Sequence, residues 1–135
     1  PYTLREKLHH TSPSLTLPPS RGKEFAMLSG EDMTAVAFNA AGGQGCISVT
    51  SNIMPKRCAE VQSACLAGDY AKAIKLHDSL VPLHSVLFCE TSPAPVKFAA
   101  SLMGKCQPDV RLPLVQPGET SKNHITEVLK NLHLL

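Results

Sequence analysis

The pattern of apolar and polar positions between residues 25 and 53 predicts a strand, a helix and a second strand. Residues 25–28 form a short apolar run that ends at a serine and a glycine, which is typical of a strand buried on both faces. Apolar residues then recur at helical spacing over 33–40, and Gly42-Gly43 end that helix. Residues 46–50 are β-branched at three of five positions, which favours a second strand. This order is a βαβ unit, so the two strands should be parallel.

Two polar turns follow the two predicted strands, Ser29-Gly30 after the first and residues 50–52 after the second. In parallel α/β folds the active site lies at the carboxyl ends of the strands, so any chemistry should converge on these turns. The alternative is that both are ordinary polar turns. The pattern alone leaves both interpretations open.

The next segment, residues 55–67, is predicted to be a helix because Pro55 suits a first helical turn and Gly68 ends the apolar pattern. Cys58 and Cys65 lie two turns apart on its apolar face. They are either ligands or small residues that face the core.

A long helix is predicted over residues 70–89, with Asp69 as its N-cap and a kink at Pro82. Its apolar residues leave little exposed face, which indicates burial or an interface. His77 and His84 lie two turns apart on it. They could act in metal binding or proton transfer, or they could be a partly buried pair that bonds to neighbours.

The rest of the chain is predicted to be helical apart from its loops. A helix over 96–103 ends at Gly104, residues 107–118 contain three prolines and should be extended, and a last helix opens at Thr120. Residues 1–24 contain four prolines and are expected to be irregular. The predicted organisation is an irregular segment (1–24), a β/α part (25–67) and an all-helical part (68–135).

The amino-acid composition argues against several classes of function. The chain has 135 residues, 43% of them hydrophobic, a formal charge of +2 and no tryptophan, which suits one folded domain and does not indicate a nucleic-acid surface. No apolar run reaches the roughly twenty residues that span a bilayer, and the amino terminus lacks the order of a signal peptide. The five cysteines form no CxxC pair and share no ligand spacing with histidines. We therefore expect a cytoplasmic protein with reduced thiols, no metal site, no cofactor and no membrane contact.

Four segments carry a family resemblance: LSGED, GGQGCISVTSN, ETSPAPVKFAASLMG and RLPL. Together they resemble the carboxy-terminal portion of the 4-hydroxy-tetrahydrodipicolinate (dihydrodipicolinate) synthases, which belong to the Schiff-base lyase superfamily. The resemblance runs from about residue 25 to the last residue and covers less than half of a full-length family member. It implies the last two βα units of a (β/α)8 TIM barrel, followed by a three-helix carboxy-terminal extension. It also implies a cytoplasmic homotetramer that condenses pyruvate with the aldehyde aspartate semialdehyde, on the route to lysine and diaminopimelate.

The family mechanism uses a lysine that attacks the pyruvate ketone. A buried lysine can do this because desolvation lowers its pKa and leaves the amine free. An ungapped count from Ser29-Gly30 places Arg5 at the position of that lysine, and arginine cannot form the imine. Lys7 is close by and is the remaining candidate, although its surroundings do not match the motif. The resemblance carries over two pyruvate-pocket positions, Gly30 and the backbone carbonyl of Ile47.

These observations support three hypotheses. The chain is part of a synthase that acts through a Schiff base, or it is a truncated, non-catalytic remnant that at most packs against a partner. Two strands cannot close a barrel, so an isolated chain should be inactive alone, expose apolar surface and associate with other copies. The third hypothesis is a small-molecule binding module that uses the loops at Gly30 and Asn52.

Overall fold

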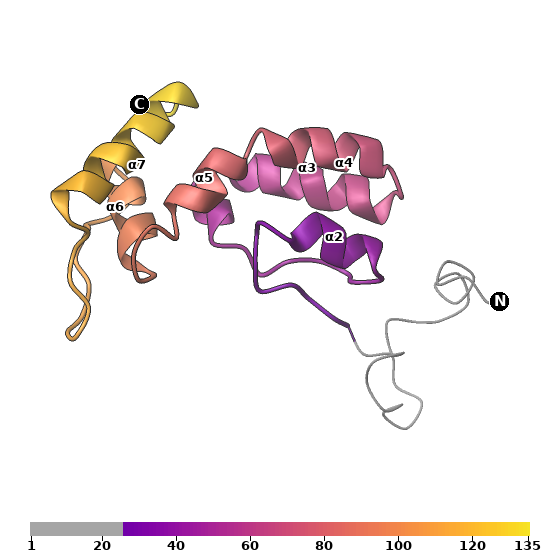
Figure 1. Cartoon of the computed structure of the whole chain (residues 1–135), viewed down its shortest axis with the longest axis horizontal. Helices are drawn as coiled ribbons and strands as arrows, with labels where there is room; N and C mark the ends of the chain where they lie inside the picture. Colours follow the sequence, from indigo (N-terminus) through magenta and orange to yellow (C-terminus); the bar gives the residue numbers. More distant parts are fainter. Residues whose placement is uncertain (1–25) are drawn as a thin grey trace.

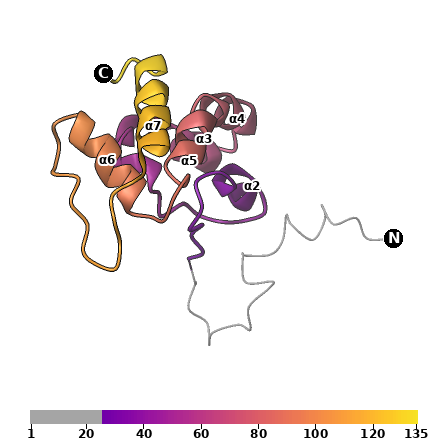
Figure 2. The same cartoon turned by 60° about the vertical axis from the view of Figure 1, so that its left-hand side comes forward.

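The computed structural model describes residues 26–135, which form an array of helices with two short extended segments (Figure 1). In chain order the elements are α2 (Ala35–Ala40), the 3-10 helix η2 (Thr50–Asn52), α3 (Pro55–Leu66), α4 (Tyr70–Asp78), α5 (Val81–Val86), α6 (Ala94–Leu102) and α7 (Glu119–Asn131). Helices α2, α3 and α4 lie together, α6 and α7 form a second group, and α5 lies between the two groups (Figures 1 and 2). The expectations for residues 1–24 and for Phe25 lie outside the described residues.

The two predicted strands meet in parallel, but neither becomes a regular strand. The described residues pair through one bridge between Ser29 and Cys46, with Ser29 N–H bonded to the Gly45 carbonyl at 2.9 Å and Ile47 N–H bonded to the Ser29 carbonyl at 2.8 Å. The parallel orientation is therefore confirmed, and the prediction of regular strands was wrong for the described residues 26–28 and 46–50. Each segment pairs only with the other within the described part of the chain, whereas a buried parallel strand is held on both sides.

The helix predicted between these segments is confirmed as α2, which begins at Ala35 and not at residue 33. The residues before Ala35 form a turn, in which the Ser29 hydroxyl accepts the Glu31 N–H at 3.1 Å and the Glu31 carboxylate accepts the Met33 N–H at 3.0 Å. Such side-chain bonds compete with helical backbone bonds at a helix start. Gly42, with φ of 108°, follows the helix and ends it as predicted.

The predictions for α3 and the start of α4 are confirmed. Pro55 is the first residue of α3, and Gly68 adopts φ of 74° after its end. The Asp69 carboxylate accepts the Lys72 N–H at 3.0 Å and so caps α4. Cys65 is buried in a core cluster and Cys58 packs against the same cluster, which supports the core interpretation of this pair.

The single kinked helix predicted over 70–89 was wrong, because the structure forms two helices, α4 and α5, separated at Ser79 and Leu80. A proline has no N–H to bond the carbonyl four residues earlier, and its ring clashes with that carbonyl. For Pro82 that residue is Asp78, which is the last residue of α4. Four helices, α4–α7, therefore follow Gly68 instead of the three that were expected.

Helices α6 and α7 pack against each other. Segment 107–118 joins them without a helix or a strand, in agreement with the extended link that its three prolines predicted. The Glu90 carboxylate holds the end of that segment by accepting the Gly118 N–H at 3.0 Å. No helix in residues 26–135 is long and apolar enough to cross a membrane.

Two hydrophobic clusters stabilise the array. The first joins the residues that flank η2 to α5, α6 and α7, and its fully buried members include Leu83, Leu87, Ile125 and Leu129. The second joins α2, α3 and α4 around Val61, Ala73 and Leu80. Met54, just before α3, packs against both clusters.

Candidate functional site

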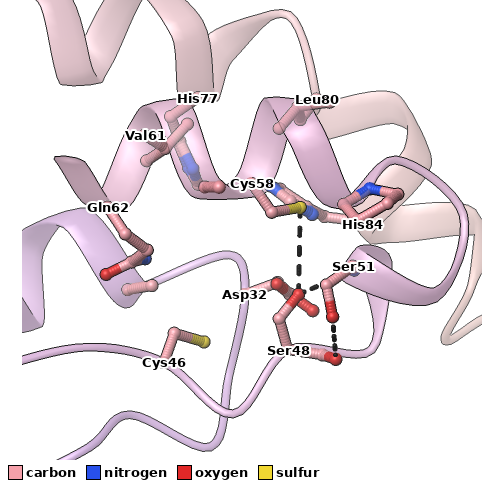
Figure 3. Close-up of a pocket in the computed structure, with 13 residues that line it drawn as sticks. Asp32, Cys46, Ser48, Ser51, Cys58, Val61, Gln62, His77, Leu80 and His84 are labelled. Carbon is pink, nitrogen blue, oxygen red and sulfur yellow. Dashed lines mark hydrogen bonds between the residues drawn. The ribbon is translucent and has the colours of Figure 1, made fainter. Parts of the chain in front are cut away.

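The best-defined cavity of the described residues lies between the 46–51 segment, α3 and the α4–α5 region (Figure 3). Its volume is about 230 Å³. Its lining is apolar along α3 and Leu80, with polar side chains contributed by Asp32, Ser48, Ser51, Gln62, His77 and His84. Titratable side chains from segments that are far apart in the sequence therefore line the same cavity.

Asp32 is the buried carboxylate of this cavity, with 5% of its surface exposed. One of its oxygens, Oδ2, accepts two backbone N–H groups, from Val49 at 2.8 Å and from Thr50 at 3.0 Å. A carboxylate is favoured there because these N–H groups open η2 and have no partner within that helix. Asp32 thereby turns the chain out of the extended conformation directly after Ser48.

His84 reaches the same turn from α5. Its Nδ1 lies 2.7 Å from the Thr50 hydroxyl, and both side chains are buried. The pKa of His84 is lowered, mainly because burial disfavours the charged imidazolium. The nearby Asp32 and Glu31 carboxylates act in the opposite direction, and His77 adds to the lowering. The His77 ring lies 5.0 Å from the His84 ring, between centroids. A neutral imidazole thus bonds to Thr50 at neutral pH.

The thiols of the cavity are protonated at neutral pH. Burial, with a smaller contribution from Asp32, raises the pKa of Cys46 to about 11, and burial also raises the pKa of Cys58. The Ser48 hydroxyl donates to the Cys58 sulfur at 3.9 Å and accepts the Ser51 N–H at 2.9 Å. Because the thiolate is the reactive form, neither cysteine is suited to act as a nucleophile.

The two predicted pocket positions lie beside each other but outside this cavity. Ile47 bonds to the residue that precedes Gly30, and both positions are exposed, Ile47 by 70%. Side chains alternate along an extended segment, so Cys46 and Ser48 line the cavity while Ile47 lies on the opposite, open face. Leu28, 50% exposed, adds to the apolar surface there. Lys7, the candidate nucleophile, lies outside the described residues.

Sequence reasoning found the histidine pair but missed its partners. The expectation that the pair bonds to neighbours holds for His84, and the described residues contain no group of three or more ligands that could hold a metal ion. The sequence places Asp32 only as an acidic residue just before the helix predicted over 33–40. Its position in the turn after the first predicted strand was the signal that could have found it, because that turn lies beside the end of the second.

Three comparisons with known proteins bear on this site. The profile of the dihydrodipicolinate synthetase family matches residues 11–132. The chain belongs to this family. The 4-hydroxy-tetrahydrodipicolinate synthase of Afipia carboxidovorans is 52% identical over 114 residues, which are 84% of this chain and 38% of that protein. The synthase of Rhodospirillum centenum is likewise 52% identical over 114 residues and is matched over 39% of its length.

Solved structures of the family give the same result in three dimensions. The dihydrodipicolinate synthase of Aquifex aeolicus superposes with a TM-score of 0.82 at 41% identity, over 84% of this chain and 39% of that one. A chloride-inhibited synthase from Acinetobacter baumannii, solved with pyruvate, gives 0.80 at 38% identity, over 83% of this chain and 38% of that one. The chain therefore spans well under half of the length of the relatives it matches.

Proposed function

We propose that this chain is the carboxy-terminal portion of a 4-hydroxy-tetrahydrodipicolinate synthase, a lyase that condenses pyruvate with aspartate semialdehyde through a lysine imine. The 52% identity over 114 residues to a curated synthase carries this proposal. Its place in the biosynthesis of lysine and diaminopimelate, and its assembly as a cytoplasmic homotetramer, follow from the same resemblance and belong to the same proposal.

We assign residues 25–67 to the last two βα units of a TIM barrel and residues 68–135 to the helical extension. The Ser29–Cys46 bridge then represents the pairing of the last two strands, and α2 and α3 are their helices. The exposure of Leu28 and Ile47 supports this assignment, because that face would be covered only when the other strands are present.

In this assignment Gly30 and the Ile47 carbonyl line the pyruvate pocket on the open face. A Cβ added at Gly30 meets no atom of residues 26–135 within 4 Å, so these residues leave the space in front of this turn open. The lysine must come from elsewhere, because residues 24–55 contain none. Lys7 is the candidate within this chain, and the strands supplied by a longer protein are the other source.

The second candidate function is a non-catalytic remnant that packs against a partner. The same open face favours it, since an unpaired edge with exposed apolar side chains associates readily. A monodisperse chain that binds no apolar dye would contradict the expectation that the isolated chain associates through this face. Sedimentation velocity, with dye fluorescence on the same sample, measures both properties.

Borohydride trapping tests the catalytic proposal. The chain is incubated with pyruvate and borohydride, both alone and fused in frame behind the amino-terminal portion of the Afipia synthase, and the intact mass is measured. A stable adduct on the fusion, and not on that amino-terminal portion alone, supports the synthase assignment. An adduct on the chain alone that disappears in Lys7→Arg would identify Lys7 as the nucleophile. If the fusion forms no adduct while the whole Afipia enzyme does, the proposal fails.

A further inference from the structure

We propose that Asp32 and the Thr50–His84 pair are positioning residues that fix the Ile47 carbonyl for pyruvate from the opposite, covered side of its segment. The inference rests on the proposed function, because it takes the Ile47 carbonyl as part of the pyruvate pocket. It assigns a role to a buried carboxylate and a buried histidine that lie outside that pocket.

The first argument is the pattern of satisfied and unsatisfied carbonyls in this turn. The Ser48 carbonyl accepts the Ser51 hydroxyl, the Val49 carbonyl accepts the Asn52 amide and N–H, and the Thr50 carbonyl accepts the N–H of Ile53. The Ile47 carbonyl accepts no hydrogen bond from any residue in the described range. It is therefore free to meet a ligand, as are the carbonyls of Cys46, Ser51 and Asn52, whereas the three residues that directly follow Ile47 have bonded carbonyls.

Asp32 supplies the second argument, because it fixes the backbone directly after Ile47. The Ile47 N–H is held by the Ser29 carbonyl at 2.8 Å, and two residues later Asp32 Oδ2 holds both Val49 and Thr50. Ile47 and Ser48 are thus clamped on both sides, so the plane of the peptide that contains the Ile47 carbonyl has little freedom. Charge-assisted bonds of this kind are stronger than neutral ones.

The Thr50–His84 bond connects this turn to the helical part of the chain. His84 lies on α5, 34 residues from Thr50, and its Nδ1 bonds to a threonine that has no exposed surface. A shift of α5 would therefore be transmitted to the turn that follows Ile47. This contact gives the helical extension a direct connection to the proposed pyruvate pocket.

Variants of Asp32 separate positioning from plain stabilisation. Both N–H groups bond to the same oxygen, so Asp32→Asn can keep both bonds through its amide oxygen, whereas Asp32→Ala loses both. Asp69→Ala is a matched control, because Asp69 also holds a backbone N–H at a helix start but lies far along the chain at α4. Thr50→Val removes the hydroxyl at nearly constant volume and serves if Asp32→Ala does not fold.

The first arm of the test uses NMR on the full chain. The ¹³C shift of the Ile47 carbonyl and the hydrogen exchange of the Val49 and Thr50 amides are measured for each variant. Asp32→Ala and Thr50→Val should shift the Ile47 carbonyl signal, while Asp32→Asn and Asp69→Ala should leave it in place. An unchanged Ile47 signal in a folded Asp32→Ala or Thr50→Val chain would overturn the proposal.

The second arm uses the fusion with the Afipia amino-terminal portion. Asp32→Ala should raise the KM for pyruvate about fivefold, the loss expected for one misplaced hydrogen bond, and should leave the KM for the aldehyde unchanged. Asp32→Asn should keep the KM for pyruvate at the value of the unvaried fusion. An equal change in Asp69→Ala, or in both substrates, would show a merely structural role. If the unvaried fusion forms no imine, the proposed function fails, and the NMR arm alone decides whether these residues fix the carbonyl.

Discussion

Lowering the pH should destabilise this protein through His84. Burial lowers the pKa of this imidazole from its ordinary value of 6.5, against the opposite effect of Asp32 and Glu31. The unfolded chain therefore binds a proton on His84 at a higher pH than the folded chain does. The free energy of unfolding should decrease as the pH falls below about 6.5, until the folded state also takes up the proton.

The geometry sets the size of this effect. A single proton taken up only by the unfolded state changes the free energy of unfolding by at most about 1.4 kcal/mol per pH unit. His84 is 3% exposed and its Nδ1 is engaged with Thr50, so solvent gives the folded imidazolium little help. Between pH 7.5 and 5.5 the loss therefore has an upper limit of about 1.4 kcal/mol, which is reached when folded His84 stays neutral over the whole range.

Urea unfolding followed by circular dichroism at a series of pH values measures this loss. The difference in unfolding free energy between the native chain and His84→Gln, taken at each pH, gives the contribution of His84, because the other titrating groups are common to both. His124→Gln, which changes an exposed histidine on α7, is the control and should keep the native slope. A His84→Gln chain with the same pH dependence as the native chain, or a native chain that gains stability on acidification, would refute the reasoning.

Three further predictions concern packing, backbone and thiol chemistry. Leu129→Ala should cost about 2–5 kcal/mol in urea unfolding because Leu129 is fully buried, while Leu112→Ala, at an 86% exposed position, should change stability by about 0.5 kcal/mol or less. Gly68→Ala should cost about 1–2 kcal/mol in thermal unfolding, since φ of 74° disfavours a side chain there. Cys46, with its pKa raised to about 11, should react with iodoacetamide far more slowly at pH 8 than the exposed Cys89, as peptide mass mapping would show; equal rates would contradict the burial argument.

The helices could be predicted because their ends are encoded locally. Pro55 begins α3, Asp69 caps α4, and glycines with positive φ follow α2, α3 and α6. Each of these signals depends on a few neighbouring residues and on backbone sterics, so no tertiary information is needed. Pro82 was recognised, but its effect was underestimated: it ended α4 at Asp78 instead of bending one long helix.

The strands and the cavity could not be predicted in the same way. An apolar, β-branched run shows that a strand is favoured, but a regular strand also needs partners, and residues 46–48 have one neighbouring segment within the described chain. Likewise, Thr50 and His84 meet across 34 residues only because α5 packs beside η2, which no local pattern encodes. The positions carried over from the family, Gly30, Ile47 and Lys7, remain predictions.

The position of Met54 between the two hydrophobic clusters bears on how cooperatively this chain unfolds. It is the one described residue before α3 that packs against both hydrophobic clusters, and the two clusters otherwise draw on different helices. Cooperative unfolding requires that the loss of one cluster destabilise the other. A smaller side chain at this position would therefore weaken the coupling between the clusters, leaving the Thr50–His84 contact as the main remaining link, and would bring the melting of α6 and α7 closer to a separate step.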